Sequence, residues 1–424
     1  LLYQWNEAAS KAWEDYSLAV TTWANAHRED VGVTPQRQTT LPNSWTKNGQ
    51  GLAYFIHDAV IHPVSSEPYK GSVIVENGQI LFAGKSYTGP LPANVNHVYA
   101  KGQHLYPGFI NAGDMTGLVE IAAVRASRDD MEIGDYQPDL SFATAIHADS
   151  AHHQVTRLNG ITHVLVRGTR GTISGQAALI QLDGVTTEDM VVTTDLGLVL
   201  RFPRAKKPKA GKEPEEPKGL EELNRWFDEA LEYGTLQDRM AEHPLQSWNK
   251  DLRMQALVPY ARGEKPILIE ADSLWNLMAA RTWVKERQLS VIWQGGRDAW
   301  KVAGILGADG AKVVVGQVHQ LPGQKNDPFD APYRNAGILK AAGCQIAFRT
   351  NDPEFARNLP YQAATAGTWG LGQEATLHAL TLGAAEVLGV DAYTGSIEAG
   401  KSANFFLCHG DPTGFKADIQ RMWI

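Results

Sequence analysis

The side chains best suited to chemistry in this sequence are not gathered in one short catalytic motif. The densest group is histidine-rich, with His147, Asp149, His152 and His153 close together. Imidazole nitrogens and carboxylate oxygens are zinc ligands in proteins, so a metal site is one interpretation of this group. The surrounding stretch is polar, and a solvated helix is the alternative that its composition favours.

Further polar candidates lie close to expected strand ends. His319 follows an apolar run and could face a pocket there. Residues 327–335, DPFDAPYRN, form a dense loop before an expected helix, and Tyr333 and Arg334 could contact a ligand; a packed and capped loop is the alternative. The glycines of residues 168–184 lack the GxxxxGK[ST] spacing of a phosphate-binding loop, so we expect turns there.

Length and composition exclude several classes of protein. A chain of 424 residues can form two or three domains, or one large barrel with an accessory domain. With 43% hydrophobic and 20% charged residues, the composition is that of a globular protein. The net charge of −8 argues against a general nucleic-acid binder, and no apolar run is long enough for a transmembrane helix. Cys344 and Cys408 are too few for a disulfide scaffold or a cysteine-rich zinc site.

From Pro107 to about Leu380, short apolar runs alternate with helical patterns. The strand-like runs are residues 108–112, 162–166, 198–202, 266–271, 290–293, 312–316 and 345–348, with helical patterns between them, such as residues 273–287, 297–308 and 335–342. Many of the runs are continuously apolar, as expected for parallel strands covered on both faces. The repeated units predict an α/β fold with a distorted (β/α)₈ TIM barrel. A doubly wound sheet is the alternative, disfavoured because no glycine-rich phosphate loop follows the first strand.

Both ends of the chain have a different, β-rich texture. Residues 54–60, 72–75 and 79–82 predict strands, and Asn77-Gly78 before the last of them is a strong hairpin signal. Residues 395–423 return to the same texture. We therefore expect a composite β-sandwich domain from residues 51–106 and 385–424, around a barrel at residues 107–384.

Two segments stand apart from these domains. Residues 1–50 predict an amphipathic helical arm, with Trp5, Trp13 and Trp23 on one stripe, and a strap. The stripe could pack on the chain's own body or on a partner chain. Residues 206–218 are charged and proline-rich, which predicts a mobile loop, either a lid or a solvated insertion. The first residue is Leu rather than Met, so we expect a processed product, with a periplasmic or secreted location slightly favoured over a cytoplasmic one.

Three motifs resemble those of the amidohydrolase superfamily, most closely its imidazolonepropionase-like branch. YPGFINA at residues 106–112 is similar to the family's PGFIDA, TLGAAEVLGV at residues 381–390 to its TLNPARILGV helix, and GSIEAGKSANFF at residues 395–406 to its GSIEPGKDADLVV turn and strand. The resemblance covers roughly residues 52–424. It implies the barrel, the composite β domain and, by ancestry, a hydrolase of C–N bonds.

The resemblance also implies a divalent metal at the C-terminal mouth of the barrel. Its ligands would be a His-x-His on strand 1, single histidines on strands 5 and 6, and an aspartate on strand 8. Here these positions hold Gly113, Met115, Glu270, Gln294 and Asn351. A neutral amide is a weak ligand and cannot act as a general base, so the implied metal site is degraded at every position.

Three neighbouring residues complete this candidate site. Asp114 could join Glu270 in binding a hard cation. Asp352 lies one step past the lost aspartate and would point to the other side of the strand. Arg349 could contact a ligand where a metal would otherwise neutralise charge, or pair with Asp352 or Glu270. No bridging lysine can be assigned on strand 4.

We therefore expect no metal cofactor and a catalytically degenerate chain that serves as a structural or regulatory subunit. Two alternatives stay open: an active hydrolase of a small amide or cyclic amide with an altered site, and a module that binds a small ligand in the old pocket. We expect a protein partner, either an amidohydrolase paralogue with intact ligands or a second copy of this chain, and no nucleic acid.

Overall fold

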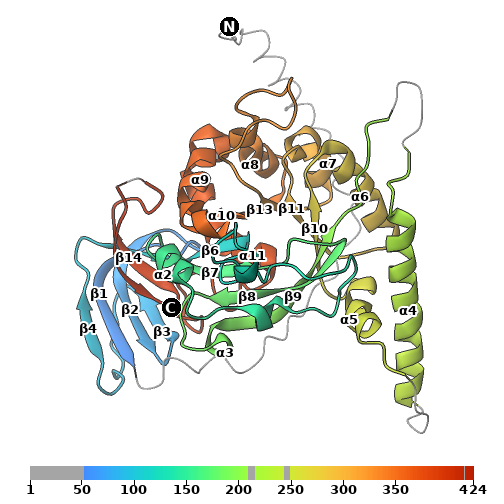
Figure 1. Cartoon of the computed structure of the whole chain (residues 1–424). Helices are drawn as coiled ribbons and strands as arrows, with labels where there is room; N and C mark the ends of the chain where they lie inside the picture. The colour runs from blue at the N-terminus through green and yellow to red at the C-terminus, as the bar shows by residue number, and fades with distance from the viewer. Residues whose placement is uncertain (1–51, 209–214, 243–248, 415) are drawn as a thin grey trace.

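Two β-sheets organise the chain, one forming a barrel and one lying beside it (Figure 1). This computed structural model describes residues 52–208, 215–242, 249–414 and 416–424. The predicted helical arm and strap, and the centre of the charged segment, lie outside the described residues. Within the described part of the chain, no helix has the length and apolar character needed to cross a membrane.

The smaller sheet takes its strands from both ends of the described chain. Its seven strands are β1 (Ala53–Ile61), β2 (Tyr69–Glu76), β3 (Gln79–Gly84), β4 (Asn96–Tyr99), β5 (His104–Pro107), β14 (Phe405–His409) and β15 (Asp418–Trp423). The order is β15-β14-β5-β1-β2-β3, with β4 also paired to β1. Because β14 pairs with β5, the predicted return of the chain end to the first β unit is confirmed.

The hairpin between β2 and β3 forms where the sequence predicted it. Asn77 and Gly78 have φ angles of 52° and 75°, and Glu76 lies opposite Gln79 in the antiparallel register. Two successive residues with positive φ are the requirement of a type I′ turn, and asparagine followed by glycine is the pair that adopts it at least cost.

The larger sheet is the barrel. Its eight strands follow chain order: β6 (Phe109–Asp114), β7 (Ile161–Val166), β8 (Ile173–Gln181), β9 (Val191–Arg201), β10 (Ile267–Ala271), β11 (Val291–Gly295), β12 (Lys312–Val315) and β13 (Gln345–Phe348). The first and last strands approach each other just past β13, where the Asn351 N–H donates to the Gly113 carbonyl at 3.2 Å. The predicted α/β class with a distorted barrel is confirmed.

One strand differs from the prediction. The glycine-containing segment of residues 168–184 was expected to form turns, but it contains β8, which pairs antiparallel with both β7 and β9. The register shifts at Gly175, whose φ is 129°. The strands β7, β8 and β9 therefore form a meander. All barrel strands except β8 run parallel to one another.

Helices pack on the outside of the barrel, and most consecutive barrel strands are connected through a helix (Figure 1). They are α2 (Ala151–Arg157), α3 (Thr187–Met190), α4 (Leu220–Glu242), α5 (Leu252–Ala261), α6 (Leu274–Glu286), α7 (Ala303–Ala308), α8 (Ala331–Ala341), α9 (Leu359–Ala366), α10 (Gln373–Leu380) and α11 (Leu382–Leu388). Local chemistry sets their ends. The hydroxyl of Ser273, for example, accepts the Asn276 N–H at the start of α6, which satisfies one of the free donors of the first turn.

Each barrel strand contributes to two cores because its side chains alternate between faces. On β10, Ile267 and Ile269 pack outward against the helices, whereas Leu268 packs inward. The inner core also contains Ala384 and Leu388 of α11. This alternation fixes which residue at each strand end points into the barrel, and it therefore positions the candidate site.

Candidate functional site

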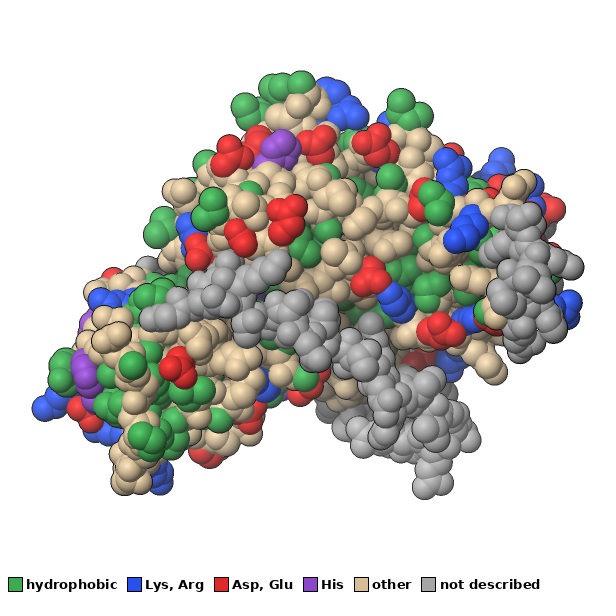
Figure 2. Space-filling model, turned by 90° about the horizontal axis from the view of Figure 1, so that it is seen from below, with side chains coloured by type: hydrophobic (Ala, Val, Ile, Leu, Met, Phe, Trp, Pro, Cys, Tyr) green, Lys and Arg blue, Asp and Glu red, His purple; other side chains and the backbone are tan. Residues whose placement is uncertain are grey.

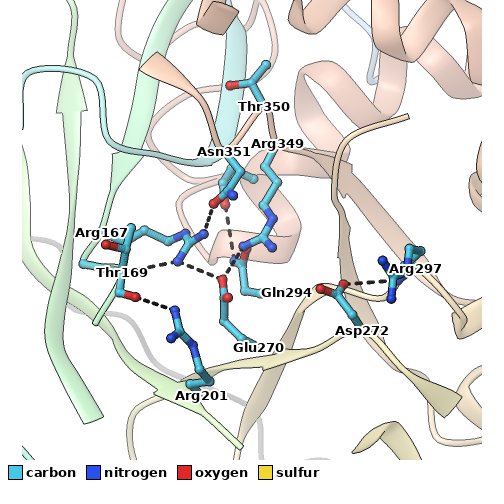
Figure 3. A network of polar contacts seen from close by, with 12 residues as sticks. Arg167, Thr169, Arg201, Glu270, Asp272, Gln294, Arg297, Arg349, Thr350 and Asn351 are labelled. Carbon is cyan, nitrogen blue, oxygen red and sulfur yellow. Dashed lines mark hydrogen bonds and ion pairs between the residues drawn. The ribbon is translucent and has the colours of Figure 1, made fainter. Parts of the chain in front are cut away.

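Three residues that the sequence singled out converge at the carboxyl ends of the barrel strands. Strands β10, β11 and β13 each place an apolar side chain in the inner core. The residue two positions later faces the same side and lies at the mouth of the barrel. These residues are Glu270, Gln294 and Arg349. The Arg349 Nη1 donates to Glu270 Oε1 at 2.7 Å and to Gln294 Oε1 at 2.9 Å (Figure 3). Of the two ion pairs considered for Arg349, the one with Glu270 forms.

A second arginine, which the sequence reasoning missed, completes this network. Arg167 follows the inward-facing Leu165 of β7 by two residues, and it is only 2% exposed. Its Nη1 lies 2.8 Å from Glu270 Oε1, and its Nη2 donates to the side-chain oxygen of Asn351 (Figure 3). The sequence signal that could have identified Arg167 is its position two residues after Leu165, which places both side chains on the same side of the strand. Arg201, at the end of β9, lies opposite Glu270 in the strand register.

The charges at this site are strongly coupled. Burial favours the protonated form of Glu270, but the Arg167 and Arg349 guanidiniums outweigh it and lower the pKa of Glu270 to about 2. Burial also lowers the pKa of Arg167 to about 10, against the opposing effect of Glu270. At neutral pH one carboxylate therefore faces two buried guanidinium cations. We call Arg167, Glu270, Gln294, Arg349 and Asn351 the arginine network.

Gly113 on β6 contributes space to this network. A Cβ atom on Gly113 would lie 3.0 Å from Arg349 Cδ, 3.1 Å from Gln294 Oε1 and 3.4 Å from Arg167 Nε. Contacts at the short end of this range are tighter than most contacts between carbon atoms. Glycine at this position therefore allows the two arginine side chains to cross the mouth where a larger residue would displace them.

Asp114 does not face this network but joins the two ends of the barrel sheet. Its Oδ2 accepts the Thr350 hydroxyl and the Asp352 N–H, and its Oδ1 accepts the N–H groups of Met115 and Thr116 and the Thr116 hydroxyl. The residue is fully buried. A buried carboxylate with five donors has its acceptor capacity used within the protein.

The remaining candidates at strand ends lie apart from the arginine network. Asp352 caps the turn that follows, where its carboxylate accepts the Glu354 N–H; burial and the nearby Asp114 raise its pKa. Met115 is half-buried against the outer core. Neither forms a hydrogen bond or ion pair with Glu270 within the described part of the chain.

The arrangement does not fit a divalent metal. The position between β6, β10 and β11 is taken by guanidinium groups, which donate only and carry positive charge, and Gly113 gives no ligand. Among the described residues, no group of three or more histidine, cysteine, aspartate or glutamate side chains is placed to hold a metal ion. A cation entering here would meet two like charges with one carboxylate to offset them.

The other candidates from the loops are held elsewhere. His319 is exposed, and its Nε2 lies 2.8 Å from the Thr365 hydroxyl. Arg334 pairs with Asp330 at 3.6 Å. Tyr333 packs against Trp369, with ring centroids 5.6 Å apart. The structure brings none of the three to the arginine network. The contacts of Tyr333 and Arg334 are those of the packed-loop alternative.

The histidine-rich stretch is distributed over the start of α2. His147 pairs with Asp129 at 2.8 Å, His152 contacts the Glu120 carbonyl, and His153 contacts the His147 carbonyl and is buried. Burial lowers the pKa of His153, which keeps it neutral. The three rings therefore have separate partners. The expected solvated helix forms, but His153 on it is buried.

Solved structures decide which fold this is. A crystal structure of an amidohydrolase from Thermotoga maritima superposes with a TM-score of 0.77 at 23% identity, covering 87% of this chain and 97% of that one. The chain has the fold of an amidohydrolase. A second amidohydrolase structure matches with a TM-score of 0.52 at 16% identity, covering 88% of this chain and 99% of that chain.

The fold predicted from the amidohydrolase-like motifs is therefore confirmed over both sheets. At these identities the likeness establishes the fold alone, and the imidazolonepropionase-like branch stays a prediction. No protein-family model and no curated protein matches the sequence.

Proposed function

We propose that this chain is a metal-free, non-catalytic amidohydrolase-fold protein that serves as a structural or regulatory subunit. One observation carries the proposal: Arg167 and Arg349 cross the barrel mouth and share Glu270, in the place where the resemblance implies a metal and its water. Metal-dependent hydrolysis needs at least three ligands and an open position for water. The arginine network supplies neither.

The residues of the network also lack the proton chemistry of a hydrolase. A general base works best when its pKa lies near the working pH, and the pKa of Glu270 is held at about 2 by its two guanidinium partners. Gln294 and Asn351 carry amides, which do not accept a proton at neutral pH. These observations disfavour the alternative of an active hydrolase with an altered site.

The subunit role rests on an exposed aromatic pair, one residue just before α8 and one just after α9. Phe329 and Trp369 are 67% and 37% exposed, and their rings contact each other edge to face with centroids 6.0 Å apart. Exposed aromatic clusters are typical of interface cores. On the face seen in Figure 2, acidic side chains are interspersed with lysine and arginine. The net charge of −8 agrees with a protein partner rather than a nucleic acid. We propose an amidohydrolase-like chain with intact ligands as the partner, and a second copy of this chain as the competing arrangement.

Metal analysis tests the proposal. The full chain, purified without chelators, is expected to contain less than stoichiometric zinc, iron and manganese, and added Zn²⁺ or Mn²⁺ should not raise its melting temperature. Arg349→Met, which removes one guanidinium beside Glu270, is the variant to be compared with Glu270→Gln. Stoichiometric metal in the wild-type chain that is lost in Glu270→Gln would overturn the proposal.

The subunit role needs a separate measurement. Native mass spectrometry of the chain from its natural source is expected to show a complex, and Trp369→Ser should weaken it. A chain that stays monomeric at micromolar concentration, with and without this substitution, would contradict the subunit role. It would not affect the proposal that the site is metal-free.

A further inference from the structure

A cavity of about 650 Å³ lies between the smaller sheet and α10, away from the barrel mouth. Its walls come from the β1–β2 loop, β5, α10 and the β14–β15 loop. Tyr106, one of the lining residues, lies just before the first residue of β6, whereas the mouth lies at the other end of that strand, at Asp114. The cavity is therefore independent of the arginine network, and its size is that of a small-molecule site.

The floor of the cavity is aromatic and uncharged. The rings of His62 and Tyr106 stack with centroids 4.1 Å apart, and His62 Nε2 lies 2.8 Å from His104 Nδ1. Burial and the neighbouring His104 lower the pKa of His62 to about 4, so its ring is neutral at pH 7. Such a floor suits an apolar body, and the face of an aromatic ring also attracts a cation.

The Tyr106 hydroxyl is the unexplained polar group of this floor. Tyr106 is only 6% exposed, and its hydroxyl makes no hydrogen bond with any residue in the described ranges. Burial and the nearby Asp411 raise its pKa, so it stays a neutral phenol. Because Tyr106 lines the cavity, this hydroxyl is available to hydrogen-bond a ligand there.

The rim of the cavity is acidic. Glu67, Glu374 and Asp411 line it, and the lining contains neither lysine nor arginine. Asp411 accepts hydrogen bonds from the Gln373 amide at 2.8 Å and from Thr413, which are neutral donors. None of the three carboxylates forms an ion pair with another described residue. The N-terminal end of α10 contributes about half a positive charge, which three full negative charges outweigh.

We propose that this cavity binds an organic cation, a primary amine with an apolar body. The ammonium would lie among Glu374, Asp411 and the Tyr106 hydroxyl, all of which can accept its hydrogen bonds. The apolar body would pack on the His62 and Tyr106 rings. The proposal does not depend on the state of the arginine network.

A matched ligand series tests this site. Benzylamine, benzyl alcohol and benzoate have nearly the same shape and carry positive, zero and negative charge at neutral pH. In calorimetric titrations of the full chain, benzylamine should bind saturably, benzyl alcohol more weakly, and benzoate not at all. The double variant Glu374→Gln/Asp411→Asn should weaken benzylamine about tenfold or more, and Tyr106→Phe should also weaken it.

The control is a second pair of carboxylates in another cavity. Asp228 and Glu286 line a separate cavity of about 460 Å³ between α4 and α6, so Asp228→Asn/Glu286→Gln should leave benzylamine binding unchanged. Urea unfolding of each variant shows whether the fold is intact. Three results would each overturn the proposal: no saturable benzylamine binding, equal binding of benzoate, or equal weakening by the control pair.

Discussion

Glu270 is the residue on which the stability of the arginine network depends most. It is the shared carboxylate of Arg167 and Arg349, which are 2% and 5% exposed. We expect Glu270→Gln to lower the free energy of unfolding by about 3–5 kcal/mol, because it leaves buried guanidiniums without a counter-charge. Urea unfolding measures the change.

A surface pair provides the control for this prediction. Asp183 pairs with Arg157 while its own side chain is 56% exposed, and exposed pairs contribute at most about 1 kcal/mol. Asp183→Asn should therefore have a small effect. Equal effects of the two substitutions would show that the arginine network adds no stability beyond that of a surface pair.

The same carboxylate predicts a specific pH dependence. The pKa of Glu270 is lowered from 4.5 to about 2 in the folded chain, so the ionised form stabilises the fold above pH 4.5, and this stabilisation is lost as the pH falls toward 2. The difference in free energy of unfolding between wild type and Glu270→Gln should stay constant above pH 4.5 and shrink below it. A difference that does not change over this range would contradict the pairing.

At the scale of elements, Asp114 joins the first and last barrel strands, β6 and β13. Its carboxylate accepts five hydrogen bonds and donates none. Asp114→Asn would place an amide NH₂ against two of those donors, and we expect a loss of at least about 2 kcal/mol. Hydrogen exchange along β13 should rise with it. Asp129→Asn, on a half-exposed carboxylate that pairs with His147, is the control, and matching effects would contradict this role for Asp114.

The elements also show how far the sequence could predict the structure. Apolar runs identified seven of the eight barrel strands because a strand covered on both faces needs little else to be recognised. β8 was missed because Gly175, Ala177 and Ala178 have low strand propensity, and pairing with β7 and β9 overrides it. The motifs singled out Glu270, Gln294 and Arg349, which the structure brings together. They did not single out Arg167, since a lone arginine at a strand end usually faces solvent.

At the scale of the whole molecule, β5 and β14 join the two sheets. These neighbouring strands send alternate side chains to opposite sides. Phe405 packs in the core of the smaller sheet against Trp423, whereas Phe406 packs in the barrel's outer core against Phe109. One short strand therefore supports both cores, and we expect them to unfold in a single transition rather than as independent domains.

This pair of phenylalanines allows a direct test of that coupling. Both are fully buried, so Phe405→Ala and Phe406→Ala should each cost about 3–5 kcal/mol. If the two sheets unfold together, each substitution should lower hydrogen-exchange protection in β2 of the smaller sheet and in β12 of the barrel alike. Phe405→Ala is the decisive variant, because its side chain contacts the smaller sheet's core and not the barrel's. Protection of β12 that survives this substitution would mean that the sheets unfold separately, and the composite sheet would then be an attached domain rather than part of the barrel's folding unit.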